Sequence, residues 1–193
     1  MTLELAMSSA RKLLVLDLDE TLVHATENQL GHAEDFRVGP YFVYRRPHLA
    51  EFLADVLQQF DVGVWTASGE LYAAQVIERI FAPDSLKFVW SSQRCTTTRD
   101  WTTGHCTTIK NLSKLKRQGY ALDSIIAVDD TPSKYARSFG NLVTVREFIG
   151  DRSDVELPAL ALYLRSLLPA TNVRAIEKRR WREQVMGNSN AEA

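Results

Sequence analysis

The sequence predicts an α/β fold: a doubly wound parallel sheet with helices on both faces and a small β-hairpin insertion after the first strand. Short apolar runs alternate along the chain with segments in which apolar residues recur at helical spacing. This alternation is typical of parallel strands joined by helical crossovers, and such crossovers cover both faces of the sheet.

Five apolar runs have the length of strands buried on both faces, and four segments carry the apolar stripe of a helix. The strands are expected over 12–16, 62–65, 88–90, 125–128 and 142–145. The helices are expected over 47–60, 69–80, 109–119 and 157–168. Prolines lie near the start of the first and last of these helices, and Gly119 closes the third.

Two segments interrupt this alternation. Residues 24–46 follow the first strand and end in an aromatic and valine-rich stretch around Gly39-Pro40, which predicts a hairpin insertion. The polar, threonine-rich segment from Ser91 to Thr108 is predicted to be an active-site loop. We expect an N-terminal extension over 1–10, one domain over 11–170, and a basic C-terminal helix and tail over 171–193.

Composition and charge exclude several classes of function. The 193 residues are 45% hydrophobic and 24% charged, with a net charge of -1, so no general attraction to nucleic acid is expected. The apolar run Leu13 to Leu16 is too short to span a membrane or to form a signal-peptide core. A cytoplasmic protein is expected, or a nuclear one in a eukaryote. Cys95 and Cys106 are expected to be reduced thiols.

The basic run from Arg174 to Arg182 contains Lys178-Arg179-Arg180 followed by Trp181. Its charge density favours a solvated helix, with docking of an acidic partner or of nucleic acid as the alternative.

The residues capable of chemistry follow three of the predicted strands directly. Asp17 and Asp19 follow the first, Thr66 and Ser68 the second, and the pair Asp129-Asp130 the fourth. In parallel α/β sheets, ligands bind beyond the carboxyl ends of the strands, so we expect these side chains to meet in one crevice.

Four carboxylates at one sheet edge repel one another unless a cation neutralises them. Carboxylate and carbonyl oxygens are hard ligands, and no paired His or Cys lies nearby in the sequence, so the expected cofactor is Mg²⁺. The predicted metal-binding residues are Asp17, Asp19, Asp129 and Asp130.

Asp17 is expected to attack phosphorus and form an aspartyl-phosphate, with Asp19 as general acid and then general base. A phosphoryl group in transfer needs fixed donors and positive charge around its oxygens. Thr66 offers a hydroxyl, Ala67 a backbone N–H at a helix start, and Lys110 a compact cation, so these three are the predicted phosphate-binding residues.

With these residues in place, the sequence resembles the haloacid-dehalogenase (HAD) superfamily, whose fold is Rossmann-like. It shows DxDxT, then Thr or Ser, then Lys, then an acidic pair, in that order. Within the superfamily it looks like the FCP/SCP class of phosphatases. The matching motifs are 16–24 (LDLDETLVH), 46–48 (RPH), 51–53 (EFL), 65–68 (WTAS) and 110–115 (KNLSKL).

The resemblance implies a Mg²⁺-dependent phosphatase that acts on phosphoserine in proteins, notably the tail of RNA polymerase II. It also implies that Asp19 binds the metal through its backbone carbonyl, and it leaves open whether Asp129 or Asp130 is the direct ligand. One position departs from the class, in which an arginine usually lies three residues before a cysteine. Here the cysteine is Cys95 and the residue three positions before it is Ser92, while Arg94 directly precedes the cysteine. This departure weakens the expectation of a polymerase-tail substrate.

Four other hypotheses are weighed against this one. A zinc site built from His24, His32, His48, His105 and the cysteines lacks ligand spacing, and neither cysteine lies in a CxxxxxR loop of a thiol phosphatase. A small phosphorylated metabolite is an alternative substrate. A non-catalytic binding scaffold is the alternative outside enzymes, although both aspartates of the DxD motif are intact.

Overall fold

A computed structural model of the chain describes residues 11–99, 102 and 106–189. Its centre is a five-stranded sheet in the order β10-β9-β1-β5-β6, and all of its neighbouring strands pair parallel. The bounds of these strands are β1 Leu13–Leu16, β5 Asp61–Trp65, β6 Val89–Trp90, β9 Ile125–Asp129 and β10 Leu142–Thr144. All five predicted strands and the parallel α/β class are therefore confirmed.

Alternation along β1 distributes its side chains between two cores, one on each face of the sheet. Leu14 and Leu16 belong to the larger core, whereas Leu13 and Val15 belong to the smaller one. This is the period-2 geometry of a strand, and it explains why a wholly apolar run is required where both faces are covered.

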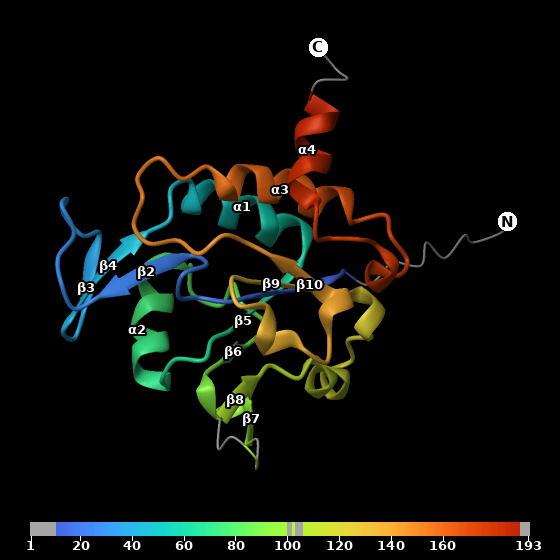
Figure 1. Cartoon of the computed structure of the whole chain (residues 1–193), viewed down its shortest axis with the longest axis horizontal. Coiled ribbons are helices and arrows are strands. Elements are labelled where there is room, and N and C mark those ends of the chain that lie inside the picture. Colours follow the sequence, from blue (N-terminus) through green and yellow to red (C-terminus); the bar gives the residue numbers. More distant parts are fainter. Residues whose placement is uncertain (1–10, 100–101, 103–105, 190–193) are drawn as a thin grey trace, which may run out of the picture.

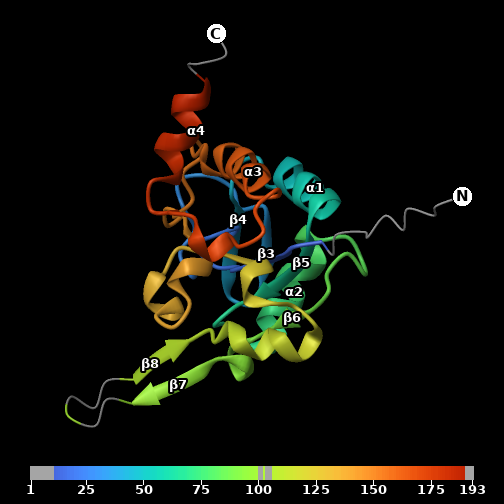
Figure 2. The ribbon, with the colours of Figure 1, turned by 90° about the vertical axis from the view of Figure 1, so that its right-hand side faces the viewer.

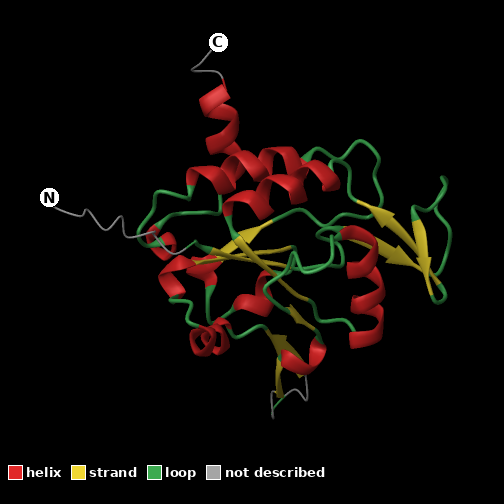
Figure 3. Ribbon diagram, turned by 180° about the vertical axis from the view of Figure 1, so that it is seen from behind, coloured by secondary structure: helices red, strands yellow, loops and turns green. Residues whose placement is uncertain are grey.

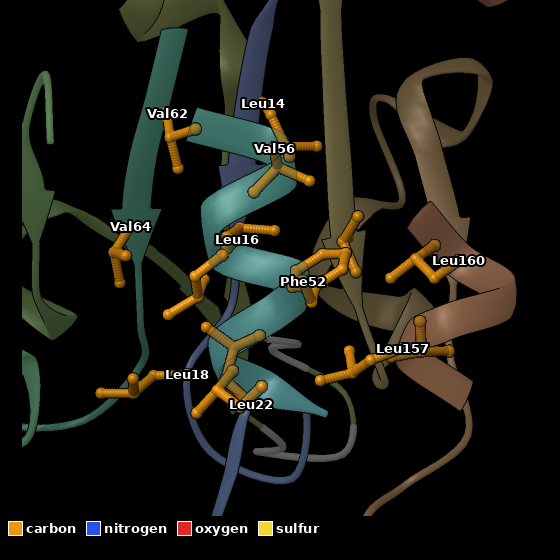
Figure 4. Packing of buried hydrophobic residues seen from close by; sticks show 14 of the residues in the cluster. Leu14, Leu16, Leu18, Leu22, Phe52, Val56, Val62, Val64, Leu157 and Leu160 are labelled. Atoms are coloured by element: carbon orange, nitrogen blue, oxygen red, sulfur yellow. The ribbon is translucent and has the colours of Figure 1, made fainter. Parts of the chain in front are cut away.

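The larger core lies under two α-helices that run side by side over one face of the sheet (Figures 1 and 3). They are α1, Leu49–Gln59, and α3, Glu156–Ser166. In Figure 4, Phe52 and Val56 of α1 lie against Leu14 and Leu16 of β1, beside Leu157 of α3. A third helix, α2 (Glu70–Ile80), follows β5 and adds Ala73 and Val76 to the same core.

The opposite face is covered mainly by short 3₁₀ segments. Leu112 and Leu115 of η2 and Tyr135 of η4 pack on it, together with Trp65 and Trp90, whose rings meet edge to face at 4.8 Å. The helix predicted over 109–119 is thus a 3₁₀ segment, closed at Gly119 with φ of 89° as expected. The 3₁₀ segments are η1 Ser92–Arg94, η2 Leu112–Gln118, η3 Leu122–Ser124, η4 Pro132–Tyr135, η5 Phe139–Asn141 and η6 Val173–Ala175.

The insertion after β1 is a three-stranded antiparallel sheet in the order β2-β4-β3. The predicted hairpin is its β3–β4 pair, which turns at Gly39 with φ of 56°, a conformation that favours glycine. The strand that the sequence did not reveal is β2, which pairs with β4. Bounds are β2 Val23–Thr26, β3 Phe36–Val38 and β4 Tyr41–Arg45.

The segment predicted as an active-site loop over 91–108 contains a second hairpin, so the prediction of a loop is wrong over 96–99 and 106–108. The strands β7 (Thr96–Arg99) and β8 (Cys106–Ile109) pair antiparallel and project from the body (Figure 2). Threonine has a high β propensity, which here prevails over its polarity. Residues 100, 101 and 103–105 of this segment, like 1–10 and 190–193, lie outside the described residues.

The C-terminal segment is partly packed against the domain. The helix predicted over 174–182 is wrong for 174–180, although Arg174, Arg179 and Arg180 are exposed as expected. Lys178 and Trp181 are buried, and the helix α4 begins only at Trp181 (Trp181–Ser189). The indole of Trp181 donates to the carbonyl oxygen of Thr144 at 2.9 Å, and Arg182 pairs with Glu156 of α3. No helix in the described part of the chain has the length and apolarity needed to cross a membrane.

Replacing Trp181 by alanine is expected to lower the free energy of unfolding by about 3–5 kcal/mol, because it empties a fully buried aromatic site and removes the indole hydrogen bond to the Thr144 carbonyl. Urea denaturation measures the change. The control is Met186→Ala on the same helix, where the side chain is 67% exposed and the expected change is within about 0.5 kcal/mol. Equal effects of the two substitutions would contradict the packing described for α4.

A buried arginine ties the loop after β1 to the segment before α3. The guanidinium of Arg46 forms a two-pronged pair with Asp154, both distances 2.8 Å, and donates to the carbonyl oxygens of Thr21 and Arg146 at 3.0 Å each. Burial by itself would raise the pKa of Asp154, but the hydrogen bonds from Arg46 hold it below the ordinary value.

Asp154→Asn is therefore expected to cost about 2 kcal/mol of stability at pH 7, the size of a charge-assisted hydrogen-bonded pair. A carboxyl group whose pKa is lower in the folded than in the unfolded protein stabilises the folded state at pH values above its unfolded-state pKa. This contribution is lost as the pH falls through the folded-state pKa. The difference between parent and variant should accordingly shrink as the pH falls below about 4. Denaturation curves at pH 7 and pH 3 test this, and a pH-independent difference would argue against the pair.

Candidate active site

Three neighbouring strands deliver the predicted site residues to one edge of the sheet. In the β9-β1-β5 register, Leu16 lies opposite both Val128 and Val64. Asp17, which directly follows β1, therefore comes level with Asp129, and its N–H donates to the Val128 carbonyl at 2.9 Å. Thr66 follows β5 at the same edge. The predicted crevice beyond the carboxyl ends thus brings together residues far apart in the sequence.

Asp17 and Lys110 form the buried centre of the site. Asp17 is 1% exposed and Lys110 is fully buried, and the lysine Nζ lies 2.7 Å from Asp17 Oδ1 and 2.6 Å from Asp129 Oδ2. Burial by itself would raise the pKa of Asp17, but the charges of Lys110 and Lys134 outweigh it, and the pKa lies below its ordinary value. Asp17 is therefore held as a carboxylate.

Asp129 and Asp130 complete a cluster of three carboxylates. One oxygen from each of Asp17, Asp129 and Asp130 can be chosen so that all lie within 4.8 Å of one another. Burial and the charge of Asp17 raise the pKa of Asp129 to about 7. One oxygen of Asp130, Oδ1, is buried without a hydrogen-bond partner. A buried carboxylate oxygen that accepts no hydrogen bond is suited to bind a hard cation.

The carboxylate of Asp19 is held by three hydroxyl groups. Thr66 and Ser68 donate to its Oδ2 at 3.2 and 2.6 Å, and Tyr72 donates to its Oδ1 at 2.5 Å. Thr66 in turn accepts from the Ser68 N–H at 2.9 Å. These donors fix the carboxylate of Asp19 beside a cavity of about 350 Å³ whose lining includes Tyr41 and Tyr72.

The structure thus gathers Asp17, Lys110, Asp129 and Asp130 in one cluster and places Asp19 and Thr66 together beside it. Ala67 is exposed in the turn between β5 and α2. Its role in binding phosphate stays a prediction, as does metal binding through the Asp19 carbonyl.

Two contacts were missed by sequence reasoning, those of Tyr72 and Lys134. Tyr72 lies in the helix predicted over 69–80, and nothing in the sequence indicates that its hydroxyl donates to Asp19. Lys134 has a sequence signal, since it lies four residues after Asp130 with a proline between them, which is the spacing of an ion pair across a helical turn.

The rival hypotheses based on His and Cys gain no support. Among the described residues, the single group that could hold a metal consists of carboxylates alone. Cys95 and Cys106 are free thiols, and Cys106 is exposed on β8. His105 lies outside the described residues.

Comparison with known proteins defines the class first. The fold matches the fission yeast RNA polymerase II CTD phosphatase Fcp1, solved with beryllium fluoride, with a TM-score of 0.56 at 18% identity over 94% of this chain and 50% of that one. A haloacid dehalogenase-like hydrolase from Xanthomonas campestris gives a TM-score of 0.54 at 11% identity, covering 83% of this chain and 97% of the other. The architecture is therefore the HAD fold, as the sequence predicted.

The chain belongs to the NLI interacting factor-like phosphatase family, whose model matches residues 12–174. It is 31% identical to Nuclear envelope morphology protein 1 of Saccharomyces cerevisiae over 188 residues, covering 86% of this chain and 41% of that protein. It is also 31% identical to the CTD nuclear envelope phosphatase 1 homolog of Drosophila melanogaster over 189 residues, covering 88% and 72%. The predicted resemblance to FCP/SCP-class phosphatases is confirmed. The chain spans less than half of the yeast relative's length.

Proposed function

We propose that this chain is a Mg²⁺-dependent phosphomonoester hydrolase that works through an aspartyl-phosphate on Asp17 and acts on phosphoserine or phosphothreonine in proteins. The observation that carries the proposal is the buried Asp17 carboxylate, flanked by two lysines and next to the pair Asp129-Asp130. A carboxylate kept charged in a buried, positively lined site is a nucleophile ready to attack phosphorus.

Each residue of the site has a role in this reaction. An oxygen of Asp17 attacks the phosphorus and the ester oxygen leaves, taking a proton from Asp19. A water then attacks the aspartyl-phosphate, Asp19 accepts the proton of that water, and phosphate departs. Lys110 and the Thr66 hydroxyl stabilise the charge on the phosphoryl oxygens.

The residues present fit a Mg²⁺ ion. Asp17, Asp129 and Asp130 offer hard oxygen ligands, one of them the buried Oδ1 of Asp130, which accepts no hydrogen bond. When bound there, the ion would neutralise charge between the carboxylates and the phosphoryl oxygens. Lys110 and Lys134 together balance only two of the three carboxylate charges, so a negative charge is left to attract an added cation.

The open surroundings of the site support a protein substrate. The insertion is a three-stranded sheet of short strands, and the cavity beside Asp19 includes residues of this sheet, Ala25 and Tyr41. A phosphorylated side chain on a polypeptide can enter such an open cavity, and the names of the relatives agree with a protein phosphatase. The names of the relatives favour a nuclear location over a cytoplasmic one.

One observation favours a second candidate, hydrolysis of a small phosphorylated metabolite. Ser92 stands where the class carries an arginine, and the nearby Arg94 guanidinium lies over the Trp90 ring, 5.3 Å from its centroid. Without an arginine at position 92 to contact a peptide, binding of a phosphopeptide gains less over binding of a small phosphoester.

The deciding experiment compares phosphopeptides with phosphorylated metabolites. Purified protein is assayed for phosphate release from phosphoserine and phosphothreonine peptides and from a panel of phosphometabolites, with Mg²⁺ and with chelator. We expect Mg²⁺-dependent release with a higher kcat/KM for peptides. A strong preference for one metabolite would overturn the proposed substrate class, and release that survives chelation would overturn the metal dependence.

A further inference from the structure

A second lysine lies among the three carboxylates proposed to bind the metal. The ammonium nitrogen of Lys134 is 3.1 Å from Asp17 Oδ2, 3.5 Å from Asp129 Oδ1 and 4.0 Å from Asp130 Oδ1. The carboxylates are the same three whose oxygens lie within 4.8 Å of one another. A side-chain cation therefore takes part in the cluster that would receive Mg²⁺.

Lys134 and Lys110 divide the oxygens of Asp17 and Asp129 between them. Lys110 contacts Asp17 Oδ1 and Asp129 Oδ2, whereas Lys134 contacts the other oxygen of each. The backbone joins the two lysines, because the Lys110 N–H donates to the Lys134 carbonyl at 2.8 Å. Lys110 is thus a fixed, buried partner, while Lys134 covers the side of the cluster that includes Asp130.

The two lysines also differ in their freedom to move. The Lys110 side chain has no exposed surface, whereas that of Lys134 is 20% exposed on the short η4 segment. A lysine has a long flexible stem and a well-hydrated head group, so its ammonium can leave the cluster for water without any change of the backbone. The same movement is closed to Lys110.

Charge and space both oppose the joint presence of Lys134 and a divalent ion. Mg²⁺ takes oxygens at about 2.0–2.1 Å in an octahedral shell that includes water, which leaves no room for an ammonium among the same oxygens. Three carboxylates and two ammonium groups sum to about -1, so adding Mg²⁺ with both lysines in place would leave an excess of positive charge.

We propose that Lys134 is the internal counter-ion of the metal site: its ammonium holds Asp17, Asp129 and Asp130 together in the metal-free protein and leaves them when Mg²⁺ binds. The inference rests on the metal site of the proposed function. Its consequence is that Lys134 stabilises the metal-free protein and weakens the affinity for Mg²⁺, because part of the binding free energy is spent on displacing the ammonium.

The test measures Mg²⁺ binding to metal-free protein by isothermal titration calorimetry at pH 7.5 for the parent and for Lys134→Met. We expect the variant to bind Mg²⁺ at least about tenfold more tightly, as expected from removing a unit charge beside the ion, and to have a lower Tm in chelator. The matched control is Lys116→Met, which removes the same charge from an exposed side chain of η2 and should leave both quantities unchanged.

A second measurement uses the parent protein, so it does not depend on folding of the methionine variant. The ¹⁵Nζ resonance of Lys134, assigned with Lys134→Arg, should shift toward that of a solvent-exposed lysine as Mg²⁺ is added, while the Lys110 resonance remains that of a buried ammonium. An unshifted Lys134 resonance on Mg²⁺ saturation would overturn the inference.

The outcomes separate this inference from the proposed function. Equal Mg²⁺ affinity of parent and Lys134→Met would overturn the role of Lys134 and leave the metal-dependent phosphatase intact. Absence of Mg²⁺ binding in both proteins would overturn both. A fall in stability without a change in affinity would reduce Lys134 to a structural ion pair and also overturn the inference.

Discussion

Asp17→Asn is expected to lower Mg²⁺-dependent turnover of an aryl phosphate by about 10⁴-fold or more, the size of effect seen when an enzyme loses its nucleophile. An amide oxygen carries no full negative charge and cannot form the aspartyl-phosphate. The substitution also removes one ligand from the carboxylate cluster and one partner from each of Lys110 and Lys134. The measurement is steady-state phosphate release, with circular dichroism as the check that the variant is folded.

The matched control for this variant is Asp84→Asn. Asp84 lies in an exposed turn with φ of 58°, a conformation that asparagine adopts readily, so this variant should keep full activity. Turnover by Asp17→Asn close to that of the parent would show that another residue attacks phosphorus. In that case the catalytic assignment fails, although the fold and the family stand.

Lys110→Met is expected to reduce turnover by about 10²–10³-fold and to lower the free energy of unfolding by about 3–5 kcal/mol. Lys110 is fully buried between Asp17 and Asp129, so the variant leaves two buried carboxylates with less compensation than before. Breaking a buried ion pair on one side costs more than the pair itself contributes. Chemical denaturation in chelator gives the stability, and an assay at saturating Mg²⁺ gives the turnover.

Its control is Lys87→Met, at a surface ion pair. The Lys87 side chain is 55% exposed and 3.6 Å from Asp61, and such pairs contribute about 0–1 kcal/mol. A loss of activity in Lys110→Met with unchanged stability would assign Lys110 to phosphate alone. Unchanged activity would remove Lys110 from the site.

Much of the site could be predicted because chemistry-bearing residues directly follow apolar strands. Asp17, Thr66 and Asp129 each lie at the end of a run whose apolarity marks it as a buried parallel strand, and parallel strands place such ends at one edge. Lys110 was found through motif order, since nothing in its local sequence shows that its side chain is buried. Tyr72 and Lys134 could not be assigned in this way, because their contacts with Asp19 and Asp17 depend on how α2 and η4 meet the sheet edge.

Four features could be predicted from local properties of the chain, its strand periodicity and its motif order: the parallel sheet, its five strands, the edge at which Asp17, Thr66 and Asp129 meet, and the phosphatase family. Other features depend on packing between distant segments. Trp181 is buried and anchors the basic C-terminal segment to the domain. The threonine-rich segment pairs as a hairpin where a loop was predicted, and the Lys134 ammonium lies within the carboxylate cluster. Each of these depends on contacts between distant segments, whose free energy outweighs local polarity and propensity.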